Sequence, residues 1–161
     1  FAPPIAIHSK VRDGSLRQAG SEVGATVLLY EGGEALRFDP HAIEVGRAGT
    51  LRVLGRLGIT PDPGLDPGPM LLSRSSRWVR AARSGILHYE VELGARVHDR
   101  DTIATILDPY GKRLSRVIAR TSGILIGRRQ HPLVNQGDAV AHVAAIEGGD
   151  GSPSGAATGE T

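Results

Sequence analysis

The chain has 161 residues, of which 40% are hydrophobic, 22% charged and only 4% aromatic, so a globular protein with an aliphatic core is expected. The formal net charge is +2, and the basic residues are scattered among acids, which argues against a nucleic-acid partner. The sequence contains no cysteine, which excludes disulfides and thiolate metal sites. No apolar run of about 18 residues and no signal peptide is visible, so we predict no membrane span, no membrane partner and a cytoplasmic location.

Residues 1–58 are predicted to alternate short strands with helices, as at the end of an α/β sheet. An apolar run at 4–8 predicts a buried strand, and the continuous apolar run Ala25–Tyr30 predicts a second, central strand covered on both faces. Two strands and two helices cannot bury a self-sufficient core. Since the chain also begins at Phe1 without an initiator methionine, we interpret it as a piece of a longer protein.

Capping residues predict the two helices of this region. Ser15 is a suitable N-cap for the first helix, and Gly24 is expected to stop it. Asp39 is a suitable N-cap for the second, with Pro40 at its first position and Gly58 at its end. The apolar residues that fall roughly on one stripe of the second helix are Ile43, Leu51, Leu54 and Leu57.

Two segments are predicted to lack regular structure. Residues 59–70 form a linker whose prolines exclude helix and central strand. Asp62 and Asp66 lie in it, but they lack the alternate-residue spacing of a calcium loop, so we interpret them as solvated. Residues 147–161 are small and polar, which predicts a disordered tail.

Residues 71–146 are predicted to be all β and contain an internal repeat. Ser84–Leu87 recurs as Ser122–Leu125, and Val97–Ala104 recurs as Val134–Ala141, with an offset that drifts by one residue. Each copy reads as strand, glycine turn, strand, polar turn with aspartate, and strand. Two such copies predict a pseudo-twofold β structure in which each half completes the core of the other.

The repeat resembles the barrel-sandwich hybrid of biotinyl and lipoyl carrier domains, which carry a modified lysine on the hairpin between their halves. Here that hairpin is Asp108–Arg113, and it contains Lys112. Lys112 lacks the flanking methionines of a biotin site and the acidic surroundings of a lipoyl site, so an ordinary exposed residue is the favoured interpretation. A carrier or a non-catalytic binding module is kept as the alternative function.

Both regions together resemble the C-terminal part of the succinylglutamate desuccinylase/aspartoacylase family, whose members are similar to zinc carboxypeptidases. The motifs in the β region are, in order, Arg77-Trp78-Val79, Ala82–Ile86, Leu93–Val97 followed by Asp101, Asp108–Gly111, and His131–Val134 followed by Gly137-Asp138. The first region adds Gly14–Arg17, Leu29–Glu34 and Leu36–Asp39. The resemblance covers nearly all of residues 1–146 and implies an α/β fragment, the end of a zinc-carboxypeptidase-like sheet, followed by an all-β barrel-sandwich hybrid domain.

The resemblance implies an enzyme that hydrolyses the amide between an acyl group and an amino acid or amine. In this family zinc, held by two histidines and a glutamate, polarises the carbonyl and lowers the pKa of bound water, and a separate glutamate transfers the proton. Glu31 matches that catalytic glutamate. Its placement agrees, since it follows the run 25–30 and precedes two glycines. From the residues alone, a polar strand end is the favoured interpretation of Glu31, and the resemblance reverses that preference.

The remaining site residues follow from the same resemblance. Arg17 is the candidate for holding a substrate carboxylate, because a guanidinium binds carboxylates bidentately; a surface ion pair is the alternative. No zinc ligand is assigned, since the family's ligands precede the segment where this chain begins. His41 and Glu44 have the bare His-x-x-Glu spacing but follow Glu31, the wrong order, and His8 matches no ligand position.

We therefore expect zinc to be a cofactor of the full-length protein, with ligands outside this chain, and the chain alone to be inactive. The expected partner is a small N-acyl substrate whose identity the sequence does not give, and formation of a homo-oligomer is left open. The β region is predicted to form a lid or wall beside the mouth of the active site, because amide hydrolysis benefits from a partly dehydrated cleft.

Overall fold

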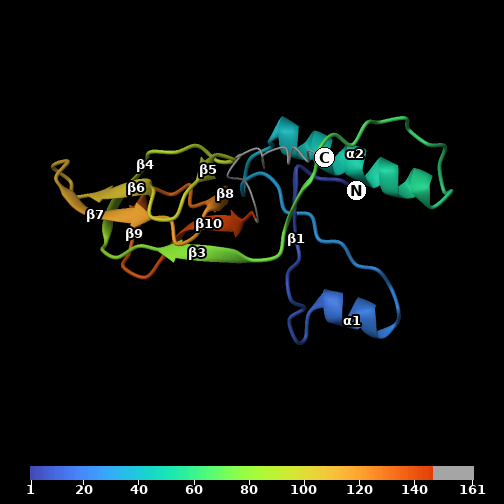
Figure 1. Ribbon diagram of the computed structural model, residues 1–161, viewed down its shortest axis with the longest axis horizontal. Coiled ribbons are helices and arrows are strands. Elements are labelled where there is room, and N and C mark those ends of the chain that lie inside the picture. Colours follow the sequence, from blue (N-terminus) through green and yellow to red (C-terminus); the bar gives the residue numbers. More distant parts are fainter. Residues whose placement is uncertain (147–161) are drawn as a thin grey trace, which may run out of the picture.

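The computed structural model describes residues 1–146, so the predicted disorder of residues 147–161 lies outside the described part. A region of two helices and one short strand occupies one end of the molecule, and a module of two antiparallel sheets occupies the other (Figure 1). The chain is thus mostly β with two helices. No helix within residues 1–146 is long and apolar enough to cross a membrane.

The predicted strand at 4–8 and both predicted helices are present. Strand β1 spans Ile5–Ile7. Helix α1 spans Leu16–Glu22, and the Ser15 hydroxyl accepts a hydrogen bond from the Gln18 amide at its N-terminus. Helix α2 spans Pro40–Arg56, with its N-cap at Asp39. Capping chemistry alone therefore located both helix starts.

The predicted central strand Ala25–Tyr30 is wrong. These residues form neither helix nor strand, and Leu28 and Leu29 are 66% and 69% exposed. The reason is the lack of a neighbour, because a strand exists only where a second strand satisfies its backbone groups. Within the described residues β1 pairs in parallel with β2 (Leu71–Ser73), and no strand lies beside 25–30.

The segment between α2 and β2 contains no helix or strand. The side chains of Asp62 and Asp66 each accept a hydrogen bond from the backbone amide two residues on, at 2.9 and 2.8 Å. This is the Asx turn, in which the aspartate side chain imitates a backbone turn. Both carboxylates are thereby used locally, in agreement with their interpretation as turn residues.

Two four-stranded antiparallel sheets make up the rest of the chain. One sheet has the order β3-β10-β8-β5 and the other has the order β7-β6-β4-β9. The strands are β3 (Ser76–Arg80), β4 (Gly85–Tyr89), β5 (Arg96–Val97), β6 (Thr102–Leu107), β7 (Arg113–Ile118), β8 (Gly123–Arg128), β9 (Leu133–Val134) and β10 (Ala139–Ala145). We call residues 76–145 the β module.

The strands that correspond in the sequence repeat exchange partners between the sheets. Strand β5, from the first copy, pairs with β8 of the second copy. Strand β9, from the second copy, pairs with β4 of the first. Each sheet therefore contains a two-residue strand supplied by the other copy, and neither copy can complete its sheet alone.

Matching hydrogen bonds close the two polar turns of the repeat. The Ser122 hydroxyl accepts from the Asp99 amide at 3.0 Å, and the Ser84 hydroxyl accepts from the Gln136 amide at 3.0 Å. The aspartate that ends each turn also forms an equivalent hydrogen bond in both copies. The Asp101 and Asp138 carboxylates accept from the amides three residues earlier, at 2.7 and 2.9 Å.

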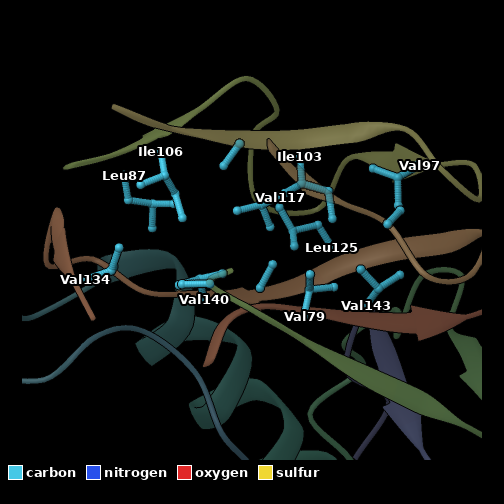
Figure 2. Packing of buried hydrophobic residues seen from close by; sticks show 14 residues of the cluster. Val79, Leu87, Val97, Ile103, Ile106, Val117, Leu125, Val134, Val140 and Val143 are labelled. Atoms are coloured by element: carbon cyan, nitrogen blue, oxygen red, sulfur yellow. The ribbon is translucent and has the colours of Figure 1, made fainter. Parts of the chain in front are cut away.

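The core lies between the two sheets and is aliphatic (Figure 2). Its largest fully buried apolar side chains are Ile103, Ile106, Leu125, Val140 and Val143. By contrast, Ala48 is the one buried hydrophobic residue among residues 1–70. Burial of each large aliphatic side chain contributes about 1.5–3 kcal/mol, so the hydrophobic stabilisation of the described chain is concentrated in the β module.

Candidate functional site

Tyr30, the residue that precedes Glu31, packs its side chain against α2. The Tyr30 hydroxyl donates a hydrogen bond to the Ala42 carbonyl at 2.7 Å, and its ring lies 5.3 Å from the Phe1 ring, centroid to centroid. Burial, assisted by the nearby Asp39 carboxylate, raises the pKa of Tyr30 above its usual value. A Cβ at position 32 would lie 2.5 Å from the Tyr30 hydroxyl, so a larger residue there would require the Tyr30 ring to move.

Glu31 therefore lies between the anchored Tyr30 and Gly32, which is close to the Tyr30 ring. Its side chain is exposed and forms no hydrogen bond or ion pair with the described residues. Its carboxylate is nevertheless close enough to His142 on β10 to favour the charged form of that imidazole. The pKa of His142 remains below its usual value, because burial, the larger effect, outweighs the carboxylate.

His142 belongs to a polar and aromatic cluster on the outer face of the sheet β3-β10-β8-β5. Its ring stacks on Trp78, with 4.2 Å between centroids and 10° between planes. Its Nε2 lies 2.8 Å from the Ser76 hydroxyl. The cluster forms because β3 and β10 are paired in a register that sets Trp78 directly opposite His142. Trp78 stays 54% exposed on the other side.

Arg17 occupies a different environment from Glu31. Its guanidinium donates hydrogen bonds to the carbonyls of Ser9 and Lys10, at 3.3 and 2.8 Å. These contacts tie α1 to the loop that precedes it. No hydrogen bond or ion pair joins Arg17 to Glu31 among residues 1–146, so the structure does not bring the two predicted site residues into contact.

No group of three histidine, aspartate or glutamate side chains within residues 1–146 is arranged to hold a metal ion. Glu44 forms a two-point ion pair with Arg47, at 2.7 and 2.9 Å, and this hydrogen bonding lowers the pKa of Glu44. His8 is exposed, and its backbone amide bonds to the Ser73 carbonyl. The residues present therefore do not fit the zinc site that the sequence resemblance implies.

Two surface hollows of the described chain are lined by residues other than Glu31. The first, of about 520 Å³, is lined by residues of β4 and β9 and by Pro109, Arg129 and His131. The second, of about 500 Å³, is lined by Arg83, Ser84, Arg113, Leu114 and Gln136. Lys112, the candidate carrier lysine, lies in the turn between β6 and β7. Neither of these two hollows is lined by Glu31.

The sequence did not predict that Trp78 and His142 lie together. Trp78 belongs to a family motif, and the sequence assigned His142 no role. Their contact depends on the register between β3 and β10, which are separated by most of the β module. The available signal was the chain's only tryptophan on a predicted strand, a residue that is enriched at contact surfaces.

Comparison with solved structures identifies similar folds. The chain matches the apo structure of the ectoine utilization protein EutE (DoeB) from Ruegeria pomeroyi, with a TM-score of 0.78 and 23% identity over 88% of this chain and 47% of that one. A succinylglutamate desuccinylase from Silicibacter sp. TM1040 matches with a TM-score of 0.74 and 20% identity, over 89% and 45% of the two chains. A succinylglutamate desuccinylase/aspartoacylase from Rhodobacter sphaeroides matches with a TM-score of 0.58 and 26% identity, over 70% and 37%.

The structural neighbours are thus proteins of the succinylglutamate desuccinylase/aspartoacylase family, and they share the fold of most of this chain. No family model and no curated protein sequence matches the chain. The chain spans about half the length of the EutE and Silicibacter structures.

Proposed function

We propose that this chain is the C-terminal part of a zinc-dependent amidohydrolase of the succinylglutamate desuccinylase/aspartoacylase family, a cytoplasmic deacylase of N-acyl amino acids or similar amides. The observation that carries the proposal is the extent of the match to EutE, which covers 88% of the chain, with a TM-score of 0.78. That span takes in both the helical region and the β module, two unlike parts joined in one order. If only the β module matched these structures, a carrier domain would be as well supported as a hydrolase.

The β module fits this proposal as a barrel-sandwich hybrid with pseudo-twofold symmetry. The exchange of β5 and β9 between the sheets supports that description, as do the paired serine hydrogen bonds at the two polar turns. In the proposed enzyme the module forms a wall next to Glu31, through the face that carries Trp78 and His142. Such a wall limits water access to one side of the reacting groups.

Glu31 is the proposed general base and acid. A carboxylate can take a proton from the attacking water and deliver it to the leaving amine, provided that it is held within hydrogen-bond reach of both. The anchoring of Tyr30 on α2 fixes the backbone on one side of Glu31. Exposure of the Glu31 side chain leaves it free to meet a substrate.

Zinc would supply carbonyl polarisation and an acidified water. As the family resemblance implies, the zinc ligands would come from polypeptide outside this chain. Arg17 remains the proposed anchor for a substrate carboxylate. Its guanidinium already serves two carbonyls, so it would bind substrate through its remaining donors or after moving from the loop.

The test uses the full-length protein that carries this chain. We expect it to contain zinc and to hydrolyse N-acyl amino acids, with N-acetylaspartate and N-succinylglutamate as the first substrates assayed. Glu31→Gln should lower kcat by about 10²–10⁴-fold while zinc content is retained, and Glu34→Gln serves as the matched control because Glu34 pairs with Arg37 on the surface. A metal-free protein, or near-normal turnover in Glu31→Gln, would contradict the proposal.

A further inference from the structure

The second surface hollow lies at the end of the β module that is farthest from the helices. Figure 1 shows the hairpin between β6 and β7 at this end, and Arg113 is the first residue of β7. The hollow has a volume of about 500 Å³, which is in the range of small-molecule pockets. Its lining includes two arginines, Arg83 and Arg113, and no acid. The hollow therefore presents positive charge to solvent.

Paired strands hold the two sides of the hollow at a fixed spacing. Leu107 on β6 pairs with Ile86 on β4 on one side and with Arg113 on β7 on the other. Two strand spacings are about 10 Å, a gap across which two arginine side chains can reach one bound group. The Ser84 hydroxyl accepts a hydrogen bond from the Gln136 amide at 3.0 Å. This bond ties the turn before β10 to the start of β4, so the backbone around the hollow is fixed.

The described residues supply no acid to neutralise these two arginines. Neither Arg83 nor Arg113 forms an ion pair within residues 1–146. Asp108, in the hairpin that leads to Arg113, accepts hydrogen bonds from two backbone amides of its own turn, at 2.9 Å each. Asp138 pairs with Arg129 at 3.4 Å. The charge of the hollow is therefore available to a group from outside the described chain.

The equivalent turn of the other copy of the repeat is built on the same serine–amide hydrogen bond but carries different charges. There Thr121 stands in place of Arg83, and Asp99 stands in place of Gln136. That turn thus has a carboxylate where the hollow has a neutral amide side chain, and a hydroxyl where the hollow has a cation. Because the two turns share one hydrogen-bonded backbone, the fold itself does not require the arginine.

We propose that the hollow between Arg83 and Arg113 binds a small oxyanion, namely the phosphate or carboxylate group of a small-molecule ligand. The planar guanidinium donates two parallel hydrogen bonds to such a group, and two guanidinium groups together neutralise its charge. Gln136 adds a side-chain amide donor, and Leu114 adds an apolar wall. The inference does not depend on the proposed function, because none of the residues that line the hollow has a role in it.

Titration of the 161-residue chain with inorganic phosphate and, separately, with succinate tests the site. Backbone amide NMR at constant ionic strength should show saturable shifts at residues 83–84, 113–114 and 136. Arg83→Gln and Arg113→Gln should each raise the Kd about tenfold, because each removes charged hydrogen-bond donors. Arg116→Gln is the matched control, since Arg116 is exposed on β7 and does not line the hollow. The anion that binds more tightly identifies the bound group as phosphoryl or carboxyl.

Gln136→Asp tests the charge argument with a residue that the repeat already accommodates. The variant supplies the carboxylate that Asp99 provides in the other copy, where the same backbone hydrogen bond is kept. This carboxylate should compete with the ligand, so we expect a rise in Kd of about tenfold or more at an unchanged urea midpoint. Shifts that sodium chloride reproduces at equal ionic strength overturn the inference. Equal Kd values in the Arg83, Arg113 and Arg116 variants overturn it as well.

Discussion

Two glycines show how single residues fix the register of the β module. Gly85 and Gly123 occupy the same place in the two copies of the repeat, at the start of β4 and β8. A Cβ at Gly85 would lie 2.6 Å from the Leu107 carbonyl oxygen, and one at Gly123 would lie 1.9 Å from the Ala144 carbonyl oxygen. Both obstacles are backbone atoms of a paired strand, so they cannot yield without breaking the sheet.

Gly123→Ala is therefore expected to destabilise the protein by about 3 kcal/mol or more, since overpacking against backbone cannot relax through a rotamer change. Gly127→Ala, on the same strand, is the matched control, because its Cβ would meet only the His142 side chain, at 3.3 Å. Urea denaturation followed by the fluorescence of Trp78 measures both. Equal stabilities of the two variants would show that the close approach at Gly123 is unimportant.

At the same scale, Glu31 and Arg17 stay predictions that come from the family resemblance, and the structure adds their surroundings. A Cβ at Gly32, which follows Glu31, would meet the Tyr30 ring. The partners of Arg17, the backbone carbonyls of Ser9 and Lys10, were not predicted. Every residue has a backbone carbonyl, so the sequence does not indicate which carbonyl a side chain will bind. The neighbour of Glu31 on β10 depends on tertiary packing, which local patterns do not encode.

At the scale of elements, local signals were reliable where the element satisfies its own backbone groups. Helices α1 and α2 begin where their caps predicted, because an N-cap and the hydrogen bonds that it completes lie within a few residues. The apolar run at 25–30 has the composition of a strand but no partner in the described chain. Composition reports what a segment can form, and pairing decides whether it does.

The cap of α2 allows a quantitative check. Asp39→Ala removes the side-chain acceptor of the Ala42 amide, which lies 3.1 Å away, and should destabilise α2 by about 1 kcal/mol. Asp62→Ala, which removes a similar bond in the exposed linker, is the control and should leave α2 unaffected. Amide hydrogen exchange of residues 42–50 measures the difference. Unchanged exchange in Asp39→Ala would show that tertiary contacts, and not the cap, hold the first turn.

For the whole molecule, the distribution of buried side chains predicts unequal stability of the two regions. The buried cluster lies wholly in the β module, from Val79 to Val143. The region 1–70 exposes many apolar side chains, including Leu16, Val23, Leu36 and Phe38. Its internal links are scattered polar contacts, such as the long-range bonds from Arg52 to the Phe1 carbonyl, at 2.8 and 3.2 Å. Such contacts are too few to repay the entropy of ordering the segment.

Residues 71–146 expressed alone should therefore fold cooperatively, with a urea midpoint close to that of the same transition in the 161-residue chain. Residues 1–70 alone should show no cooperative transition, because removal of β2 also leaves β1 without its partner. Tryptophan fluorescence and near-UV circular dichroism of the first fragment, and far-UV circular dichroism of the second, provide the measurements. A first fragment that stays unfolded would mean that the helical region supplies stability that its buried area does not reveal, and that the β module is no independent unit.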